Sequence, residues 1–154
     1  GLGAAVTTDD LERELEAATG RDLSAFFAGF VRASGHPELR VTFAPSGAET
    51  ELRIEQLQED GPPDGFLFPL DLDVVDASGR AERARVELTG KTTTARLRTA
   101  SPARRVVVDP DEHAIATSSC GQSGGQCKDG FRCAPQRPGV SMCVPRPSEL
   151  PSRR

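Results

Sequence analysis

The sequence contains no Trp and no Tyr, and it has only two His and two Lys residues. Without Trp and Tyr, a hydrophobic core has to be built mainly from Leu, Val, Ile and the seven Phe residues. Hydrophobic residues make up 36% of the 154, which suits one ordinary domain with a small appendage. No apolar run approaches the roughly 18 residues of a membrane helix, so the sequence predicts no membrane span.

The sequence also lacks a surplus of basic over acidic residues. Nineteen Lys and Arg residues stand against 23 Asp and Glu residues, a net charge of -4. A protein that binds nucleic acid needs a basic face, so this balance argues against nucleic acid as a main partner. Nearly all of the positive charge is Arg, a bias typical of a genome with high GC content.

The N-terminus has neither an initiating Met nor a secretory signal. The first residues, "GLGAAVTT", contain no basic region followed by a hydrophobic run. We therefore expect either a piece of a longer protein or a matured product.

Residues 7–19, "TTDDLERELEAAT", have the pattern of an amphipathic helix. Thr7 or Thr8 can cap its free amide groups, two Asp residues favour its N-terminus, and Gly20 is a natural stop. Its apolar positions recur at helical spacing and are Leu11, Leu15 and Ala18.

A second helix is predicted at residues 22–34, "DLSAFFAGFVRAS", with Asp22 as its cap and with Gly35 and Pro37 ending it. Its broad apolar face consists of Phe26, Phe27, Phe30 and Val31.

From residue 38 the apolar residues alternate, which predicts short strands with one buried face each. Turn signals such as "PSGAE" and "DASGR" separate these runs. Pro69 within the third run indicates an edge strand or a bulge. The six predicted strands are "ELRVTFAP", "ETELRIEQLQ", "GFLFPLDLDVV", "ERARVELTG", "TTTARLRTA" and "RRVVVDP".

These patterns predict a mainly β fold with an N-terminal helical pair, in which a β-sandwich is followed by a small disulfide-stapled segment. Four parts are expected: the helices in residues 1–36, the sandwich in 37–116, a Cys-rich module in 117–145 and a disordered tail in 146–154.

All four cysteines, Cys120, Cys127, Cys133 and Cys143, fall in the last 35 residues. Their surroundings are rich in Gly, Ser and Pro and need staples to become ordered. Disulfides fit better than a zinc site, which usually starts from close Cys pairs, or than free thiols. Two bridges allow three pairings, and the sequence does not choose among them. The interleaved pairing, Cys120 with Cys133 and Cys127 with Cys143, is a guess that the short loops favour. Such bridges indicate a secreted or otherwise extracytoplasmic protein.

The helical part and its junction with the first strand resemble the end of the catalytic domain in the aminopeptidase N family of zinc peptidases. The resemblance rests on Thr8–Asp10, Gly20–Leu23, the Phe26 and Phe27 pair, and Gly35 with Pro37. "LRIEQLQ" and "VVVDPD" are similar to the β-sandwich that follows in that family. The likeness covers about residues 5 to 115, and it departs from the family at Phe30, where members usually have Trp.

The family's catalytic groups are absent from this sequence. It has no His-Glu-x-x-His pair to hold Zn²⁺, no Gly-Ala-Met-Glu-Asn motif and no Tyr for the tetrahedral intermediate. The resemblance therefore implies no catalytic, cofactor or metal residue here, and it places the zinc in an upstream catalytic domain. It also implies that Phe26, Phe27 and Phe30 form a packing face toward that domain.

The remaining polar candidates favour structural roles. We expect His36 in a turn and His113 in a solvated strand end, since its acidic neighbours lack the spacing of a calcium loop. The serines at 101, 118 and 119 have no nucleophile-elbow context. Alternating arginines predict the wet face of the sandwich, with a polyanion-binding strip as the alternative, and are Arg83, Arg85, Arg96 and Arg98.

Two functions remain open. The first is the C-terminal, non-catalytic portion of a secreted zinc metallopeptidase, which supports the catalytic domain. In that case the Cys-rich module, which is similar to modules of secreted bacterial proteins, contacts an extracellular protein or surface. The alternative is a free-standing extracellular module for binding or adhesion, made of the sandwich and the Cys-rich knot.

Overall fold

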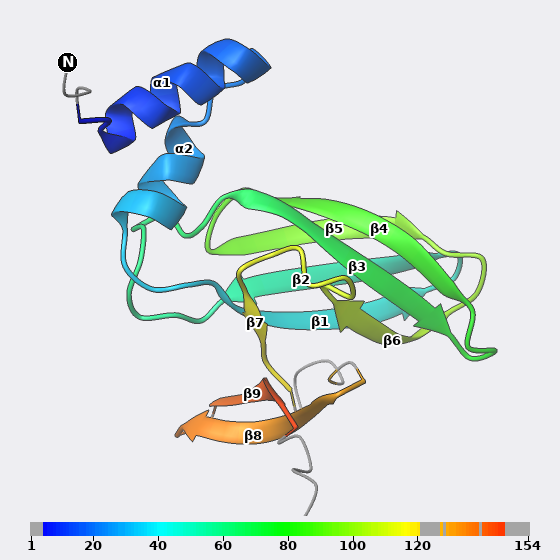
Figure 1. Ribbon diagram of the computed structural model, residues 1–154. Coiled ribbons are helices and arrows are strands. Elements are labelled where there is room, and N and C mark those ends of the chain that lie inside the picture. The colour runs from blue at the N-terminus through cyan, green and yellow to red at the C-terminus, as the bar shows by residue number, and fades with distance from the viewer. Residues whose placement is uncertain (1–4, 121–126, 128, 139, 147–154) are drawn as a thin grey trace, which may run out of the picture.

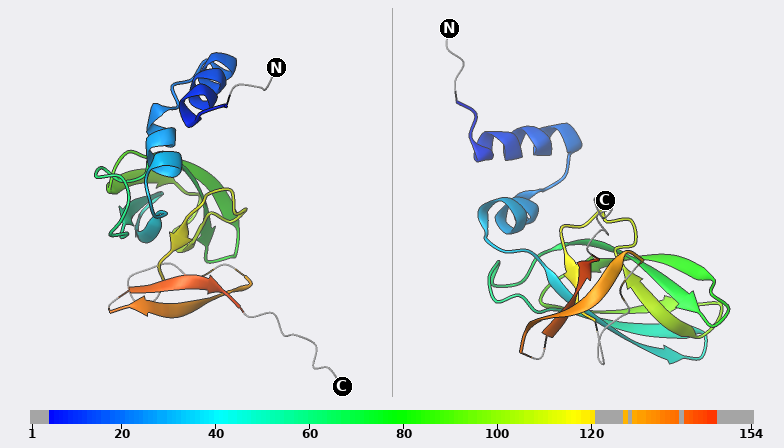
Figure 2. Two further views of the ribbon diagram at one scale, coloured as in Figure 1. Left: turned by 60° about the vertical axis from the view of Figure 1, so that its left-hand side comes forward. Right: turned by 60° about the horizontal axis from the view of Figure 1, so that its bottom comes forward.

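The structure, a computed structural model, describes residues 5–120, 127, 129–138 and 140–146. Figure 1 shows two helical segments at one side of a β-sandwich and a small hairpin at the other, and Figure 2 shows the same order from two further directions. The helical segments are α1 (Thr8–Thr19), α2 (Ser24–Phe26) and the π-helix η1 (Phe27–Arg32). The strands of the sandwich are β1 (Glu38–Ser46), β2 (Glu49–Gln56), β3 (Phe68–Asp76), β4 (Ala81–Leu88), β5 (Thr92–Arg98), β6 (Ala103–Val108) and β7 (Thr117–Ser118).

Helix α1 begins and ends as its sequence predicts. Thr7 is the N-cap, and a capping box links it to Asp10, whose carboxylate accepts a hydrogen bond from the Thr7 N–H at 3.0 Å. Gly20 closes the helix with a φ of 66°, in the left-handed region where a Cβ atom is costly.

The second helix differs from the single α-helix predicted for residues 22–34. After one turn of α2, the chain widens into η1, in which the Ala33 N–H donates to the carbonyl of Ala28 at 3.1 Å. A π-helix has more residues per turn than an α-helix, so the α-helical spacing does not hold throughout this segment, although the rings of Phe26 and Phe30 still stack with centroids 5.3 Å apart. The N-cap of α2 is Leu23 rather than the predicted Asp22, although the Asp22 carboxylate accepts from the Ser24 N–H at 2.9 Å.

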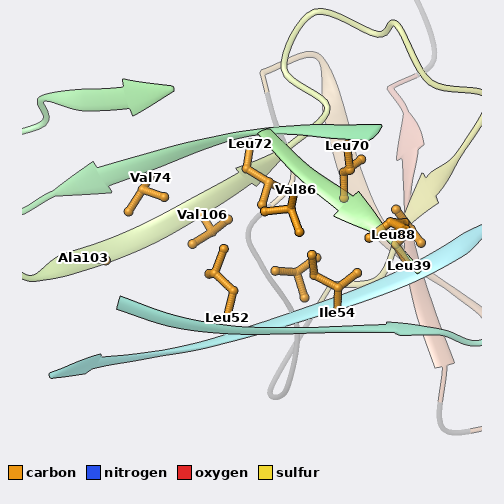
Figure 3. Close-up of a cluster of buried hydrophobic side chains, with 11 residues drawn as sticks. Leu39, Leu52, Ile54, Leu70, Leu72, Val74, Val86, Leu88, Ala103 and Val106 are labelled. Carbon is orange, nitrogen blue, oxygen red and sulfur yellow. The ribbon is translucent and has the colours of Figure 1, made fainter. Parts of the chain in front are cut away.

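Two sheets face each other in the sandwich, one in the order β5-β2-β1-β7 and the other in the order β4-β3-β6. Side chains from both sheets form one core (Figure 3), as the alternating pattern predicts, and each fully buried Leu, Val or Ile contributes about 1.5–3 kcal/mol. The core residues are Leu39, Val41, Leu52, Ile54, Leu70, Leu72, Val74, Val86, Leu88, Ala103 and Val106.

Pro69 lies in β3, the central strand of its sheet, but β6 pairs only with Leu72–Asp76, so β3 is open on that side at Pro69, and its pairing with β4 shows no bulge there. The Asp109 N–H donates to the carbonyl of Asp71 at 2.9 Å, which marks where the partner segment of β6 leaves β3. In a strand, residues two positions apart direct their backbone N–H and C=O groups to the same side. The nitrogen of Pro69, like the carbonyl of Asp71, is therefore on the β6 side, where no strand of the described chain is present to accept a hydrogen bond from it.

Two further strands, β8 (Phe131–Arg137) and β9 (Val140–Pro145), form a hairpin within the Cys-rich segment. The bridges Cys120–Cys133 and Cys127–Cys143 hold this hairpin, which is the interleaved pairing that the short loops favoured. Residues 117 and 118, assigned to the Cys-rich module by composition, form β7 and pair in parallel with β1. Most of the predicted tail, residues 147–154, lies outside the described residues.

Candidate functional site

Helix α1 is attached to η1 through its acidic side. The Arg32 guanidinium donates to the Asp9 carboxylate at 2.6 Å and also to Glu12. The Glu16 carboxylate accepts from the Leu23 N–H at 2.8 Å. Residues 9, 12 and 16 share one face of an α-helix, so these hydrogen bonds to Leu23 and Arg32 all come from the acidic face of α1.

The apolar side of α1 is turned outward. Leu11 is 49% exposed and Leu15 is 39% exposed, and α1 contributes no buried residue. Leu11 and Leu15 form an apolar stripe along α1. At 100° of rotation per residue, this stripe points roughly 120° away from the acidic face that contacts η1. Amphipathic helices ordinarily bury the apolar side, so α1 presents to solvent a face that the sequence pattern marks for packing.

The aromatic face of the second helix is divided rather than uniformly exposed. Phe27 is only 1% exposed, which corrects the expectation that all three Phe residues face a missing domain. The ring centroid of Phe30 lies 5.0 Å from that of Phe66 and 5.5 Å from that of Phe68, so Phe30 packs on the sandwich. Phe26 remains 47% exposed, and its ring stacks on that of Phe30.

A groove of about 390 Å³ lies where the helical segment meets the open edge of β3. Its apolar wall comes from both parts of the chain, and Ile115, which lines its rim, is 73% exposed. The lining residues are Phe26, Phe30, Phe68, Pro69, Asp71, Arg85, Asp109, His113, Ala114 and Ile115.

One end of the groove is polar. Arg85 donates two hydrogen bonds to the Asp71 carboxylate, at 2.8 and 3.1 Å, and this holds the pKa of Asp71 below its usual value. The His113 Nδ1 atom lies 4.0 Å from an oxygen of the same carboxylate. The carboxylate of Asp109 accepts from the backbone N–H groups of His113 and Ala114, which fixes the loop that carries them. The arrangement therefore shapes a surface, and the described lining contains no Ser, Thr, Cys or Lys nucleophile.

The two histidines do not share a site. His36 Nε2 lies 3.5 Å from the Thr117 hydroxyl, while His113 lies at the groove. Among the described residues, the one group of three potential metal ligands consists of the sulfurs of Cys120, Cys127 and Cys143, which are in disulfides.

The outward arginines of the sandwich face acidic partners across the strands. Arg83 donates to Asp73 at 2.6 Å and also contacts Asp111, and these carboxylates raise its pKa. Arg96 lies 3.6 Å from Glu51, and Arg98 is opposite Glu49 in the strand register. Because their charge is matched locally, these arginines form cross-strand pairs rather than the strip that a polyanion requires.

The sequence pattern alone did not predict the outward direction of Leu11 and Leu15 or the place of Ile115 at the groove. One signal in the sequence was available for the direction of α1. Asp9, Glu12 and Glu16 recur on one face of the helix, and Arg32 follows in the next helical segment, so this acidic face was a candidate to contact Arg32.

Of three comparisons with known proteins, only the one with solved structures found a match, and it concerns the fold. No protein-family description and no curated protein matches the sequence. Among solved structures, the chain is similar to an aminopeptidase A from Legionella pneumophila, crystallised in complex with aspartic acid, with a TM-score of 0.62 and 20% identity. The match covers 78% of this chain and only 14% of that aminopeptidase chain. The chain thus has the fold of a small part of a peptidase.

Proposed function

We propose that this chain is the C-terminal, non-catalytic portion of a secreted, bacterial zinc metallopeptidase of the aminopeptidase N type. Its helices and sandwich support a catalytic domain that precedes them, and the zinc ligands belong to that domain. The Cys-rich module contacts an extracellular protein or surface.

The observation that carries this proposal is the uncovered apolar surface of the helical segment. Seven large apolar side chains are exposed in the described part of the chain, and five of them lie between residues 6 and 31. They are Val6, Leu11, Leu15, Phe26 and Val31. Exposed apolar side chains that gather on one region mark an interaction surface, whereas scattered ones need no explanation. The outer faces of the sandwich carry cross-strand ion pairs instead, so the helical side is the face suited to a partner domain.

The likeness to a peptidase fold supports the same proposal. In the aminopeptidase A chain, the part similar to this one is joined to a much larger remainder. The hydrogen-bonded sandwich gives a rigid body against which helices can be held. The two disulfides support an extracytoplasmic location, where such bonds persist.

A second candidate function is a free-standing extracellular binding module. It is favoured by the packing of η1, because Phe27 is buried and Phe30 contacts the sandwich without any other domain. In that case the groove beside His113 would be the binding site.

The mass of the native product separates these two functions. A mass several times the 16.4 kDa of this chain supports the peptidase portion. A mass equal to that of this chain, about four units lower before reduction of the two disulfides than after, contradicts it and supports the free module.

A pair of variants tests the apolar surface directly. Leu15→Glu places a charge on the outward stripe of α1, while Ala17→Glu places the same charge on an exposed position outside it. We expect Leu15→Glu to lower the binding of a hydrophobic dye to the isolated chain and Ala17→Glu to leave it unchanged. Equal dye binding by both variants and the parent sequence would contradict a docking role for the stripe.

A further inference from the structure

We propose that the four cysteines, once their two disulfides are reduced, form a tetrahedral thiolate site for Zn²⁺. The C-terminal hairpin would then have two mutually exclusive states, one closed by disulfides and one closed by a metal ion. This inference does not depend on the function proposed above, and the site is separate from the zinc expected in a peptidase domain.

Three of the four cysteine sulfur atoms lie close together in the oxidised protein. The Sγ atoms of Cys120, Cys127 and Cys143 all lie within 4.8 Å of one another, although they belong to two different disulfides. A Zn–S bond length of about 2.3 Å requires sulfur atoms about 3.8 Å apart in a tetrahedron. After reduction, the sulfurs of Cys127 and Cys143, bonded at 2.07 Å in the disulfide, must move apart to about 3.8 Å. The Sγ atom of Cys120, which lies within 4.8 Å of both, must approach them by at most about 1 Å.

The fourth ligand is supplied by strand pairing. Cys133 on β8 lies directly opposite Cys143 on β9, so both side chains project from the same face of the hairpin. The Sγ atom of Cys133 is bonded to that of Cys120, so it also starts beside the cluster. The sequence lacks the close Cys pairs of ordinary zinc sites, but the hairpin brings together residues that are ten positions apart.

Several backbone contacts around the cysteines do not involve the disulfides. The Cys120 N–H donates to the carbonyl of Ser141 at 2.9 Å, and Ser119 forms a bridge with Met142, whose side chain is 3% exposed. At the open end of the hairpin, the Arg146 N–H donates to the carbonyl of Gly130 at 2.8 Å. These contacts remain available after reduction and keep the cysteines near one another.

The charge of the segment suits a thiolate complex. Four thiolates around Zn²⁺ carry a net charge of about -2. Residues 117–154 contain six basic and two acidic residues, a net charge of +4 in a chain whose total is -4. Arg132 and Arg146 are exposed on the described part of the hairpin. Positive charge close to the complex lowers its electrostatic energy.

A phosphine can supply the electrons that reduce the two disulfides. Each disulfide accepts two electrons from phosphorus and two protons from water, giving two thiols, and the water oxygen becomes the phosphine oxide. Zinc then displaces the four thiol protons, so binding becomes stronger as the pH rises.

The test is a titration of the full chain with Co²⁺, which reports thiolate coordination by its visible and near-ultraviolet absorption. We expect phosphine-reduced protein to bind one Co²⁺ in a tetrahedral thiolate site, Zn²⁺ to displace it, and the oxidised protein to show no such absorption. Zinc should also protect all four cysteines from alkylation, as read by mass spectrometry. This second measurement remains informative if the reduced hairpin unfolds without metal, since zinc must then restore the protection.

Two variants complete the test. Cys133→Ser removes one ligand and should raise the Co²⁺ concentration at half-saturation by roughly tenfold or more. Ser141→Ala, a neighbour that supplies no thiolate, should leave it unchanged. The proposal is overturned if reduced protein shows no thiolate-to-cobalt absorption, if zinc protects fewer than four cysteines, or if Cys133→Ser binds as tightly as the parent sequence.

Discussion

Two neighbouring aromatic residues should respond very differently to truncation. Phe27 is 1% exposed and Phe26 is 47% exposed, although the sequence places both on one apolar helix. Phe27 therefore belongs to the core of this chain, whereas Phe26 belongs to its exposed apolar surface. Phe27→Ala and Phe26→Ala therefore form a matched pair in which the same atoms are removed.

The expected costs follow from burial. Removing a fully buried Phe ring costs about 3–5 kcal/mol, because the lost transfer free energy adds to the cost of the cavity. Phe27 also lies 5.7 Å below the guanidinium carbon of Arg32, the residue that holds α1, so its loss should loosen α1 as well. For Phe26, about half of the 1.5–3 kcal/mol of full burial applies, which gives a cost of about 1 kcal/mol.

Urea denaturation of the isolated chain, followed by circular dichroism, measures both costs as free energies of unfolding. The reasoning is refuted if the two variants lose equal stability, or if Phe26→Ala loses more. In a full-length parent that contains a preceding catalytic domain, the cost of Phe26→Ala should rise by about 1 kcal/mol or more, because the ring would then be buried. An unchanged cost in that parent would show that Phe26 does not meet the domain.

Two further changes test the local chemistry of the fold. The backbone N–H of Thr7, its hydroxyl and Arg13 lower the pKa of Asp10 from 3.8 to about 2. Since this folded-state pKa is depressed, the contribution of Asp10 to stability is present above about pH 4 and is lost as the pH falls through about 2. Thr7→Ala should raise this pKa, as measured by NMR titration, and cost about 1 kcal/mol of stability, whereas an unchanged pKa would contradict the capping box. The Gln56 amide donates to the carbonyls of Phe66 and Gly90 and accepts from the Phe66 N–H, so Gln56→Leu should cost about 2–4 kcal/mol in urea unfolding, and a cost below 1 kcal/mol would contradict this role.

Much of the fold could be predicted because its signals are local. The alternation in "ELRVTFAP" marks Leu39 and Val41 as buried residues, and both are at most 2% exposed. The same kind of signal identified the cap at Thr7 and the stop at Gly20. The cysteine pairing, in contrast, was decided by the structure, which bridges Cys120 with Cys133 and Cys127 with Cys143.

The candidate site was less predictable, since it depends on which segments meet. The rings of Phe26 and Phe27 lie 5.8 Å apart, yet only Phe27 is buried, and no local pattern in the sequence marks the π-helix η1 in which it lies. Composition also concealed the β8–β9 hairpin, because Gly, Ser and Pro dominate its surroundings while its order comes from disulfides and strand pairing.

By itself, the sequence determined the periodicities, the caps, the turns and the absence of a zinc-peptidase motif, because each of these is set by residues a few positions apart. Only the tertiary structure decided that α1 is held by Arg32 through its acidic side and turns Leu11 and Leu15 outward. Only the structure placed three cysteine sulfurs in one cluster and allowed Pro69 in a central strand. These outcomes depend on contacts between distant segments, whose combined packing and hydrogen bonding outweigh the preference of any one segment.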